Sequence, residues 1–378
     1  MKADSNEKAK GGAANSRFFR ERNKEASMSN KSIEFIYWFA YYNLDSPSVR
    51  YRAKYPLEYF KDKLNVSSYL VIPGYSVKRI YLFLRAYFSA LFFRKPNSII
   101  VIQRVQSKFI YANLLKILVI FQRQETVYDL DDADYLEHSP DILYFFVKNC
   151  EKIAAGSIEI SRHLKQFNPN ITYVTSPVVD LGIFKKNKNS LFTIGWIGGF
   201  AWGHKDSLLK YVFPALKRVS FKFKIVFIGV LKKADINFIY DYFKENSNIE
   251  IEIPESINWN AEKEIQDRIV SFDIGIATLS DNPIQISKSG IKAKQYLNNG
   301  VPVLSTNLPE NNRVIVDGKN GYFCSDFTEF RERIYQFYYM SNNEYKYFSK
   351  NARESIKYFD HSNYFHDFEK LKAGNHNF

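Results

Sequence analysis

The sequence predicts an α/β fold in which two Rossmann-like domains face each other across a cleft. Short apolar runs of strand length alternate with helix-length segments along most of the chain, a pattern typical of parallel sheets with right-handed crossovers. A polar, charged stretch at 185–190 (KKNKNS) separates two such regions and marks the expected hinge. The length of 378 residues exceeds what one sheet-centred core usually holds, and a hydrophobic content of 46% can fill two cores.

Residues 1–30 precede the first apolar run and are expected to lie outside both domains. They are rich in Lys, Asn, Ser, Glu and Ala, and they lack the apolar core of a signal peptide. This composition predicts either a disordered N-terminal arm or a remnant of the expression vector.

The first domain is expected at 31–187 and should contain six strands. Each candidate is a short apolar run, as expected of strands that are covered on both faces of a sheet. The candidates are 33–39, 68–72, 98–102, 126–130, 152–155 and 172–174.

The longest apolar block, at 80–93 (IYLFLRAYFSALFF), lies between the second and third of these strands. It contains Arg85 and is shorter than the roughly 20 residues that a membrane-spanning helix needs. The basic residues that flank it are Lys78, Arg79, Arg94 and Lys95. It predicts either a helix lying at an anionic membrane surface or a helix that covers the sheet with snorkelling ends, and a second apolar run at 109–121 favours the covering helix.

The second domain is expected at 188–345, again with six strands, and helices should follow at 346–378. Here too the candidates are short apolar runs separated by helix-length segments. They are 192–197, 222–229, 249–253, 272–277, 301–305 and 321–324.

The residues after the strand at 272–277 form the strongest candidate for a binding site. Open α/β sheets bind ligands beyond the carboxyl ends of their strands. In this position Lys288, Ser289 and Gly290 precede a helical segment that also contains Lys292. Free backbone N–H groups and two cations at a helix start favour a pyrophosphate ligand. The alternative is an ordinary strand, loop and helix unit with solvated lysines.

This region resembles the nucleotide-sugar-dependent glycosyltransferases of family 4, which have the two-domain GT-B fold. Those proteins carry a Glu, seven residues and a second Glu before a G-x-P-V sequence; here Ser287 and Gln295 occupy the two Glu positions. One branch of the family instead has G-x-K-x-x-Q-Y before its G-x-P-V, which this chain matches at Gly290, Lys292, Gln295, Tyr296, Gly300, Pro302 and Val303. In the family the second Glu binds the donor ribose, and an amide oxygen can accept the same hydrogen bond without a charge.

The resemblance implies a fold and a reaction. It implies that the C-terminal helices cross back onto the first domain. It also implies transfer of a sugar, with retention, from a nucleotide diphosphate donor to a glycan or lipid-linked glycan acceptor in surface polysaccharide biosynthesis. The nucleotide sugar is then a substrate, and neither a cofactor nor a metal is expected. The alternatives are a non-catalytic GT-B scaffold or binding module in a polysaccharide-synthesis complex, and a sugar-nucleotide epimerase.

The first strand of the second domain leads into a second candidate donor loop. Gly198 and Gly199 allow close approach of a ligand to the backbone, and Lys205 follows at a helix start. The resembling family has a Lys in this loop that binds the donor pyrophosphate, where negative charge grows as the glycosidic bond breaks. Lys205 matches that position, and its alternative is a solvated cation.

The first domain should supply the acceptor side of the cleft. After its first strand, Arg50 and Arg52 could hold a phosphate or carboxylate of the acceptor, or could be surface charges on a helix start. After its fourth strand, the sequence YDLDDAD contains Asp131 and Asp132. We expect one of these two to orient the acceptor hydroxyl or to act as a base, the alternative being a helix N-cap.

The formal net charge of +13 indicates polyanionic partners. No helix-turn-helix, zinc-finger or RNP-like sequence is present, so no nucleic-acid partner is expected. The two cysteines, Cys150 and Cys324, indicate neither a disulfide framework nor a thiolate metal site. We therefore expect a cytoplasmic protein, and a peripheral position on the cytoplasmic membrane face stays open.

Overall fold

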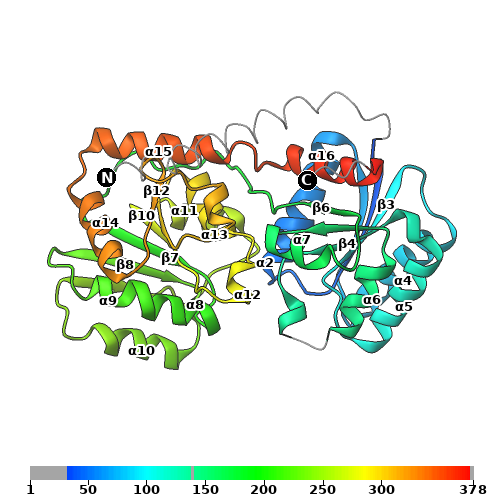
Figure 1. Cartoon of the computed structure of the whole chain (residues 1–378), viewed down its shortest axis with the longest axis horizontal. Coiled ribbons are helices and arrows are strands. Elements are labelled where there is room, and N and C mark those ends of the chain that lie inside the picture. The colour runs from blue at the N-terminus through cyan, green and yellow to red at the C-terminus, as the bar shows by residue number, and fades with distance from the viewer. Residues whose placement is uncertain (1–31, 138–139, 375–378) are drawn as a thin grey trace.

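The computed structural model describes residues 32–137 and 140–374, so the segment expected as an N-terminal arm at 1–30 lies outside them. The described residues form two six-stranded sheets that lie side by side along the molecule (Figure 1). The strand orders are β2-β1-β3-β4-β5-β6 and β12-β11-β10-β7-β8-β9. Every pairing within these sheets is parallel. The predicted fold class is confirmed.

All six strands expected in the first half are present within two residues of the expected bounds. The strands are β1 (Phe35–Ala40), β2 (Ser67–Val71), β3 (Ser98–Gln103), β4 (Thr126–Leu130), β5 (Lys152–Ala155) and β6 (Ile171–Tyr173). The helices between them are α2 (Pro47–Val49), α3 (Tyr55–Leu64), α4 (Val77–Phe92), α5 (Phe109–Gln122), α6 (Asp141–Asn149) and α7 (Ile158–Leu164), and the π-helical segment η2 (Arg50–Lys54) joins α2 to α3.

The second half likewise contains all six expected strands. They are β7 (Thr193–Ile197), β8 (Phe223–Ile228), β9 (Ile249–Glu252), β10 (Ile274–Ala277), β11 (Val303–Ser305) and β12 (Gly321–Phe323). Its helices are α8 (Trp202–Ser207), α9 (Phe213–Leu216), α10 (Lys233–Phe243), α11 (Glu262–Ile269), α12 (Pro283–Ile286), α13 (Ile291–Asn298), α14 (Phe327–Tyr339) and α15 (Asn342–Ile356). One more helix, α16 (His361–Ala373), follows.

The strands are apolar because each sheet is covered on both faces. In β1, Tyr37 and Phe39 pack under α4, α5 and α6, whereas Ile36, Trp38 and Ala40 pack under α3 and α16. The last helix, α16, therefore belongs to the core of the first half although α15, just before it, contacts α13 of the second half. Figure 1 shows this return of the chain to the first sheet.

Both long apolar helices, α4 and α5, cover the first sheet with one face only. In α4 the buried residues are Ala86, Tyr87 and Ala90, and many of the remaining apolar side chains are exposed. The second apolar run, α5, also covers the sheet, as expected, with Ala112, Leu115, Leu118 and Val119 buried and other apolar side chains exposed. Within the described residues, no helix combines the length and apolar character that crossing a membrane requires.

Candidate active site in the cleft between the sheets

A cavity of about 410 Å³ lies between the two halves. Its walls are loops and helix starts that follow β1, β3, β4 and β6 of the first sheet and β7, β8, β9, β10 and β11 of the second. Strands of a parallel sheet all end at one edge, so each half presents its ligand-binding edge to this space. The predicted residues that line the cavity are Arg50, Asp131, Asp132, Gly198, Gly199, Lys288, Ser289, Gly290, Lys292 and Gln295.

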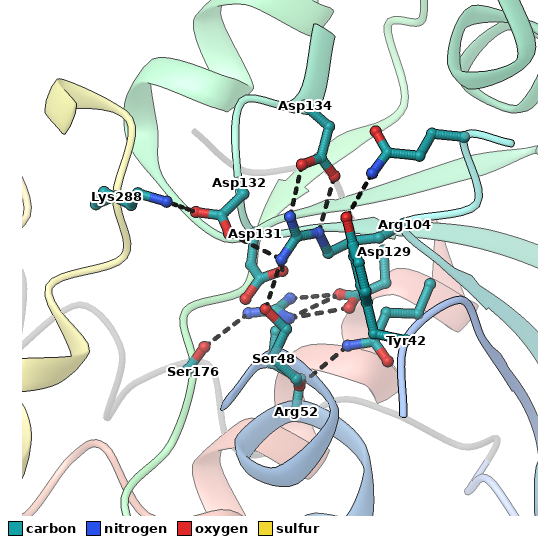
Figure 2. A network of polar contacts seen from close by, with 12 residues as sticks. Tyr42, Ser48, Arg52, Arg104, Asp129, Asp131, Asp132, Asp134, Ser176 and Lys288 are labelled. Carbon is teal, nitrogen blue, oxygen red and sulfur yellow. Dashed lines mark hydrogen bonds and ion pairs between the residues drawn. The ribbon is translucent and has the colours of Figure 1, made fainter. Parts of the chain in front are cut away.

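Arg104 organises the acidic residues that follow β4 (Figure 2). It leaves β3 with a left-handed backbone, at φ 53°. Its Nε donates to Asp134 Oδ2 at 2.8 Å, and its Nη1 lies 2.8 Å from Asp132 Oδ2. Burial alone would lower the pKa of Arg104, but the surrounding carboxylates raise it well above its usual value. Sequence reasoning missed this residue, although it stands directly after a buried strand.

Asp131 faces the cavity with capacity to accept a hydrogen bond. Its Oδ1 is buried and accepts none from the described residues, and Arg104 Nη1 lies 3.7 Å away. The backbone of Asp131 packs against Gly156, where a Cβ would come within 2.6 Å of Asp131 Cα. The strand end therefore holds this carboxylate in place with an acceptor directed at the cleft.

Lys288 reaches across the cleft to Asp132. Its Nζ donates to Asp132 Oδ1 at 2.7 Å, which joins the two halves of the molecule (Figure 2). Burial would raise the pKa of Asp132, but Lys288 and Arg104 hold it below its ordinary value. Burial would lower the pKa of Lys288, and the Asp132 carboxylate raises it above the ordinary value. Both groups are therefore charged at neutral pH.

The start of α13 faces the same cavity. Gly290 is its N-cap residue, has a φ of 66°, and provides no side chain to cap the helix. Residues 289–293 line the cavity. The first N–H groups of a helix have no partner inside the helix, so they are available to an anion there.

Lys292 and His204 form a second basic pair in the cavity wall. Lys292 Nζ lies 3.0 Å from His204 Nδ1. Burial, followed by repulsion from Lys288, lowers the pKa of Lys292 to about 7. Burial and Lys292 lower the pKa of His204 well below its ordinary value, so the ring is neutral. Gly198 makes room for this lysine, because a Cβ there would lie 2.8 Å from Lys292 Cε.

A chain of hydrogen bonds connects Gln295 to the first half of the molecule. Gln295 Nε2 donates to the Tyr51 hydroxyl at 2.5 Å, and Tyr51 donates to Glu262 Oε2 at 2.6 Å. Arg50 lies beside Tyr51 and lines the cavity. Its Nη1 donates to two backbone carbonyls, and its guanidinium lies 5.7 Å from the ring centroid of Trp259. Tyr51, Glu262 and Trp259 were not identified from the sequence.

Two predicted residues, Lys205 and Arg52, lie outside the cavity lining. Lys205 Nζ pairs with Asp235 at 3.0 Å and lies 4.6 Å from the Phe238 ring centroid, on the side of α10. Arg52 is fully buried, and its Nε donates to Asp129 Oδ2 at 2.9 Å. The structure therefore places Arg52 in a core ion pair and His204, rather than its neighbour Lys205, at the cavity.

No protein-family model matches the sequence, and no curated protein matches it. Solved structures do resemble the fold. The Anabaena protein Alr3699/HepE in complex with UDP has a TM-score of 0.62 at 10% identity, over 89% of this chain and 98% of that one. The lipopolysaccharide outer core galactosyltransferase WaaB has a TM-score of 0.58 at 14% identity, over 89% and 98%.

A glycosyltransferase from Rickettsia africae ESF-5 is similar over its whole length. Its TM-score is 0.62 at 12% identity, over 92% of this chain and 100% of that one. Likeness at such identities shows a shared fold. It confirms the predicted GT-B architecture of two Rossmann-like domains.

Proposed function

We propose that this protein is a glycosyltransferase that moves a sugar from a nucleotide diphosphate donor to a glycan or lipid-linked glycan acceptor. The observation that carries the proposal is the cavity between the two sheets, where Lys288, Lys292 and the start of α13 gather positive charge. The similarly folded HepE has been crystallised with UDP and with UDP-glucose, which supports a nucleotide-sugar donor. Membership of glycosyltransferase family 4, retention of configuration and a role in surface polysaccharide synthesis are parts of this proposal.

The donor diphosphate is proposed to bind at the start of α13. Breaking the glycosidic bond leaves extra negative charge on the nucleoside diphosphate, and preorganised cations and N–H groups stabilise such charge in the transition state. Lys288 and Lys292 supply the cations, and Ser289 and Gly290 allow approach to the backbone. Gly198 and Gly199 also line the cavity, and Gly198 lies against Lys292. Lys205 would join them only by leaving Asp235.

The acceptor is proposed to enter from the first half of the molecule. Asp131 Oδ1 accepts no hydrogen bond from the described residues, which suits a carboxylate that orients an acceptor hydroxyl. Asp132 lies beside it and shares the cavity. The buried Nε of Arg50 has no hydrogen-bond partner among the described residues, which suits a contact with an anionic group on the acceptor.

The test is a thermal shift assay with a panel of nucleotides and nucleotide sugars, with and without chelator. At least one nucleoside diphosphate should raise the melting temperature, and chelator should not remove the effect. Lys288→Ala should abolish the shift yet leave a folded protein, because Asp132 keeps Arg104 as its partner. Lys346→Ala, at an exposed position on α15, is the matched control and should keep the shift.

Absence of a shift with every nucleotide, or a normal shift in Lys288→Ala, would contradict the proposed donor site. Incubation with the nucleotide sugar that binds then separates the alternatives. Slow donor hydrolysis or transfer to an acceptor supports a transferase, whereas binding with neither supports a scaffold. Conversion of the sugar nucleotide without acceptor supports an epimerase.

A further inference from the structure

The outward sides of α4 and α5 form one exposed apolar surface. The two helices pack against each other, and their inward sides contribute small and apolar residues to the core of the first half. Their exposed apolar side chains are between 66% and 86% accessible at Val77, Phe92, Phe93, Phe109, Ile110 and Phe121. Monomeric proteins rarely leave large contiguous apolar patches open to water, so this apolar face indicates an interaction surface.

The same part of the chain is strongly basic. Between Asp62 and Glu125 the sequence has ten lysines and arginines and neither aspartate nor glutamate. Several of these cations stand at the ends of the two helices that carry the apolar face: Lys78, Arg79, Lys95 and Lys108, together with Arg94 and Arg123, which pair with Glu125 and Glu151. A partner for this face must therefore be apolar at its centre and negatively charged around it.

We propose that the apolar face docks on the surface of an anionic lipid bilayer, with α4 and α5 lying in the interface. Helices that lie at a membrane surface bury an apolar side among the acyl chains while basic residues meet anionic headgroups. A second copy of this chain fits poorly, since a symmetric interface would bring the basic residues of both copies together. A protein partner would need acidic groups placed around an apolar patch of matching shape, whereas an anionic bilayer offers both without a specific fit.

The apolar face reaches the edge of the sheet that borders the cleft. Phe109 begins α5 only five positions after Arg104, and Val77 begins α4 after the carboxyl end of β2. The rest of both helices runs along the side of the first half that faces away from the second half (Figure 1). Membrane docking stands independently of the proposed function. If both hold, an acceptor anchored in the bilayer would approach the cavity from the side that carries Arg104 and Asp131.

The experiment is co-sedimentation of the full chain with lipid vesicles. We expect binding to vesicles that contain phosphatidylglycerol, weaker binding at high salt, and little binding to pure phosphatidylcholine. The triple variant Phe92→Ser, Phe109→Ser, Phe121→Ser should bind the anionic vesicles on the order of tenfold more weakly, because each Phe loses apolar area buried in the interface. The control Tyr339→Ser, Tyr347→Ser removes exposed aromatic side chains from α14 and α15 and should bind like the unmodified chain.

Each other outcome overturns the proposal or one of its parts. Failure of the unmodified chain to bind anionic vesicles overturns it. If the triple variant binds as tightly as the unmodified chain, other basic residues, those at 1–31 included, make the lipid contact. That result also overturns the proposal. Equal binding to neutral vesicles removes the role of the cations. A dimer in light scattering that the triple variant abolishes, without vesicle binding, assigns the face to a second copy. The nucleotide-induced thermal shift should be unchanged in the triple variant, which keeps failure here distinct from failure of the donor site.

Discussion

Asp132 holds two cations that come from opposite halves of the molecule, Arg104 and Lys288. A diphosphate at the start of α13 would compete with Asp132 for Lys288. When Lys288 turns to the diphosphate, Asp132 loses one of the charges that hold its pKa below the ordinary value, so its pKa should rise. Donor binding would then make this carboxylate a better proton acceptor at the moment when the acceptor needs one.

Asp132→Asn tests this exchange. The amide cannot hold Lys288 as an ion pair and does not repel a diphosphate, so we expect the nucleoside diphosphate to bind roughly threefold to tenfold more tightly. Sugar transfer should fall by about 10²-fold or more because the carboxylate is lost. Calorimetry and a transfer assay measure the two effects. Asp131→Asn, which removes no Lys288 contact, should change nucleotide affinity less, and weaker nucleotide binding in Asp132→Asn would refute the exchange.

Lys292 should make donor binding depend on pH. Its pKa of about 7 means that it is only partly charged at neutral pH, and a bound diphosphate favours the charged form. Below pH 7 the lysine is charged before and after binding, so affinity is greatest there. Above pH 7 binding requires uptake of a proton, and affinity should fall by up to about tenfold per pH unit until the pKa of the complex is reached.

A nucleotide sugar is the appropriate ligand for this measurement, because its diphosphate is esterified at both ends and does not itself titrate near neutrality. The groups around Lys292 do not change charge in this range: His204 is neutral, and Lys288 and Asp132 are charged. Lys292→Arg keeps a positive charge at all these pH values, so its affinity should be nearly constant from pH 7 to pH 9. A flat profile in the unmodified protein would argue against Lys292 as a donor ligand.

Ten of the twelve residues predicted from residue type and position after a strand line the cavity, but the direction of each side chain was not predictable. Asp131 and Asp132 were predictable because they directly follow a buried strand. On α8, one step turns a side chain by about 100°, so His204 faces Lys292 while Lys205 faces Asp235. Arg50 and Arg52 diverge in the same way along η2. Every face of such a short helix carries both polar and apolar residues. The sequence therefore does not show which face meets the cavity.

At the scale of elements, the strands were predictable because both sheet faces are covered. Neighbouring residues of β1 such as Tyr37 and Trp38 enter different cores, so the run is apolar throughout. The orientation of α4 was not predictable, because the side chains that face the sheet are small, as at Ala86 and Ala90, and its outer side is apolar as well. When both sides of a helix carry many apolar residues, the sequence does not show which side faces the sheet.

The loop after β7 should be sensitive to the smallest added side chain. Gly198 has a φ of 152°, and a Cβ there would press on Lys292. Gly198→Ala should therefore displace Lys292 and weaken nucleotide binding on the order of tenfold, in addition to the backbone strain. At Gly199 a Cβ meets no atom within 4 Å, so Gly199→Ala should weaken binding less. Equal affinities in the two variants, measured by calorimetry, would show that the space for Lys292 is unimportant.

At the scale of the whole molecule, contacts across the cleft join residues far apart in sequence. Glu310 of the second half accepts hydrogen bonds from the Ile158 N–H at 2.9 Å and the Tyr173 hydroxyl at 2.7 Å. Lys294 Nζ donates to the Thr175 hydroxyl. The sequence shows none of these pairings, since each depends on how two separately formed cores are placed. The expected domain bounds, 31–187, 188–345 and 346–378, stay predictions, although α16 packs in the first core.

That packing makes the stability of the first half depend on the last helix. Phe368 is buried, and its ring centroid lies 5.6 Å from that of Trp38 and 5.1 Å from that of Tyr364. Phe368→Ala should lower the free energy of unfolding by about 3–5 kcal/mol, as measured in urea, because it leaves a cavity between α16 and the sheet. Tyr347 on α15 is exposed, so Tyr347→Ala should change the free energy of unfolding by less than about 0.5 kcal/mol.

The two halves should respond differently to the loss of Phe368. The proposed donor site belongs to the second half, so a nucleotide should still raise the melting temperature of Phe368→Ala. The melting temperature without nucleotide should be lower than that of the unmodified protein. A loss of stability below about 1 kcal/mol would mean that α16 covers the first sheet without supporting it. Loss of the nucleotide effect in a folded variant would mean instead that the crossing helix holds the cleft in the geometry that the donor requires.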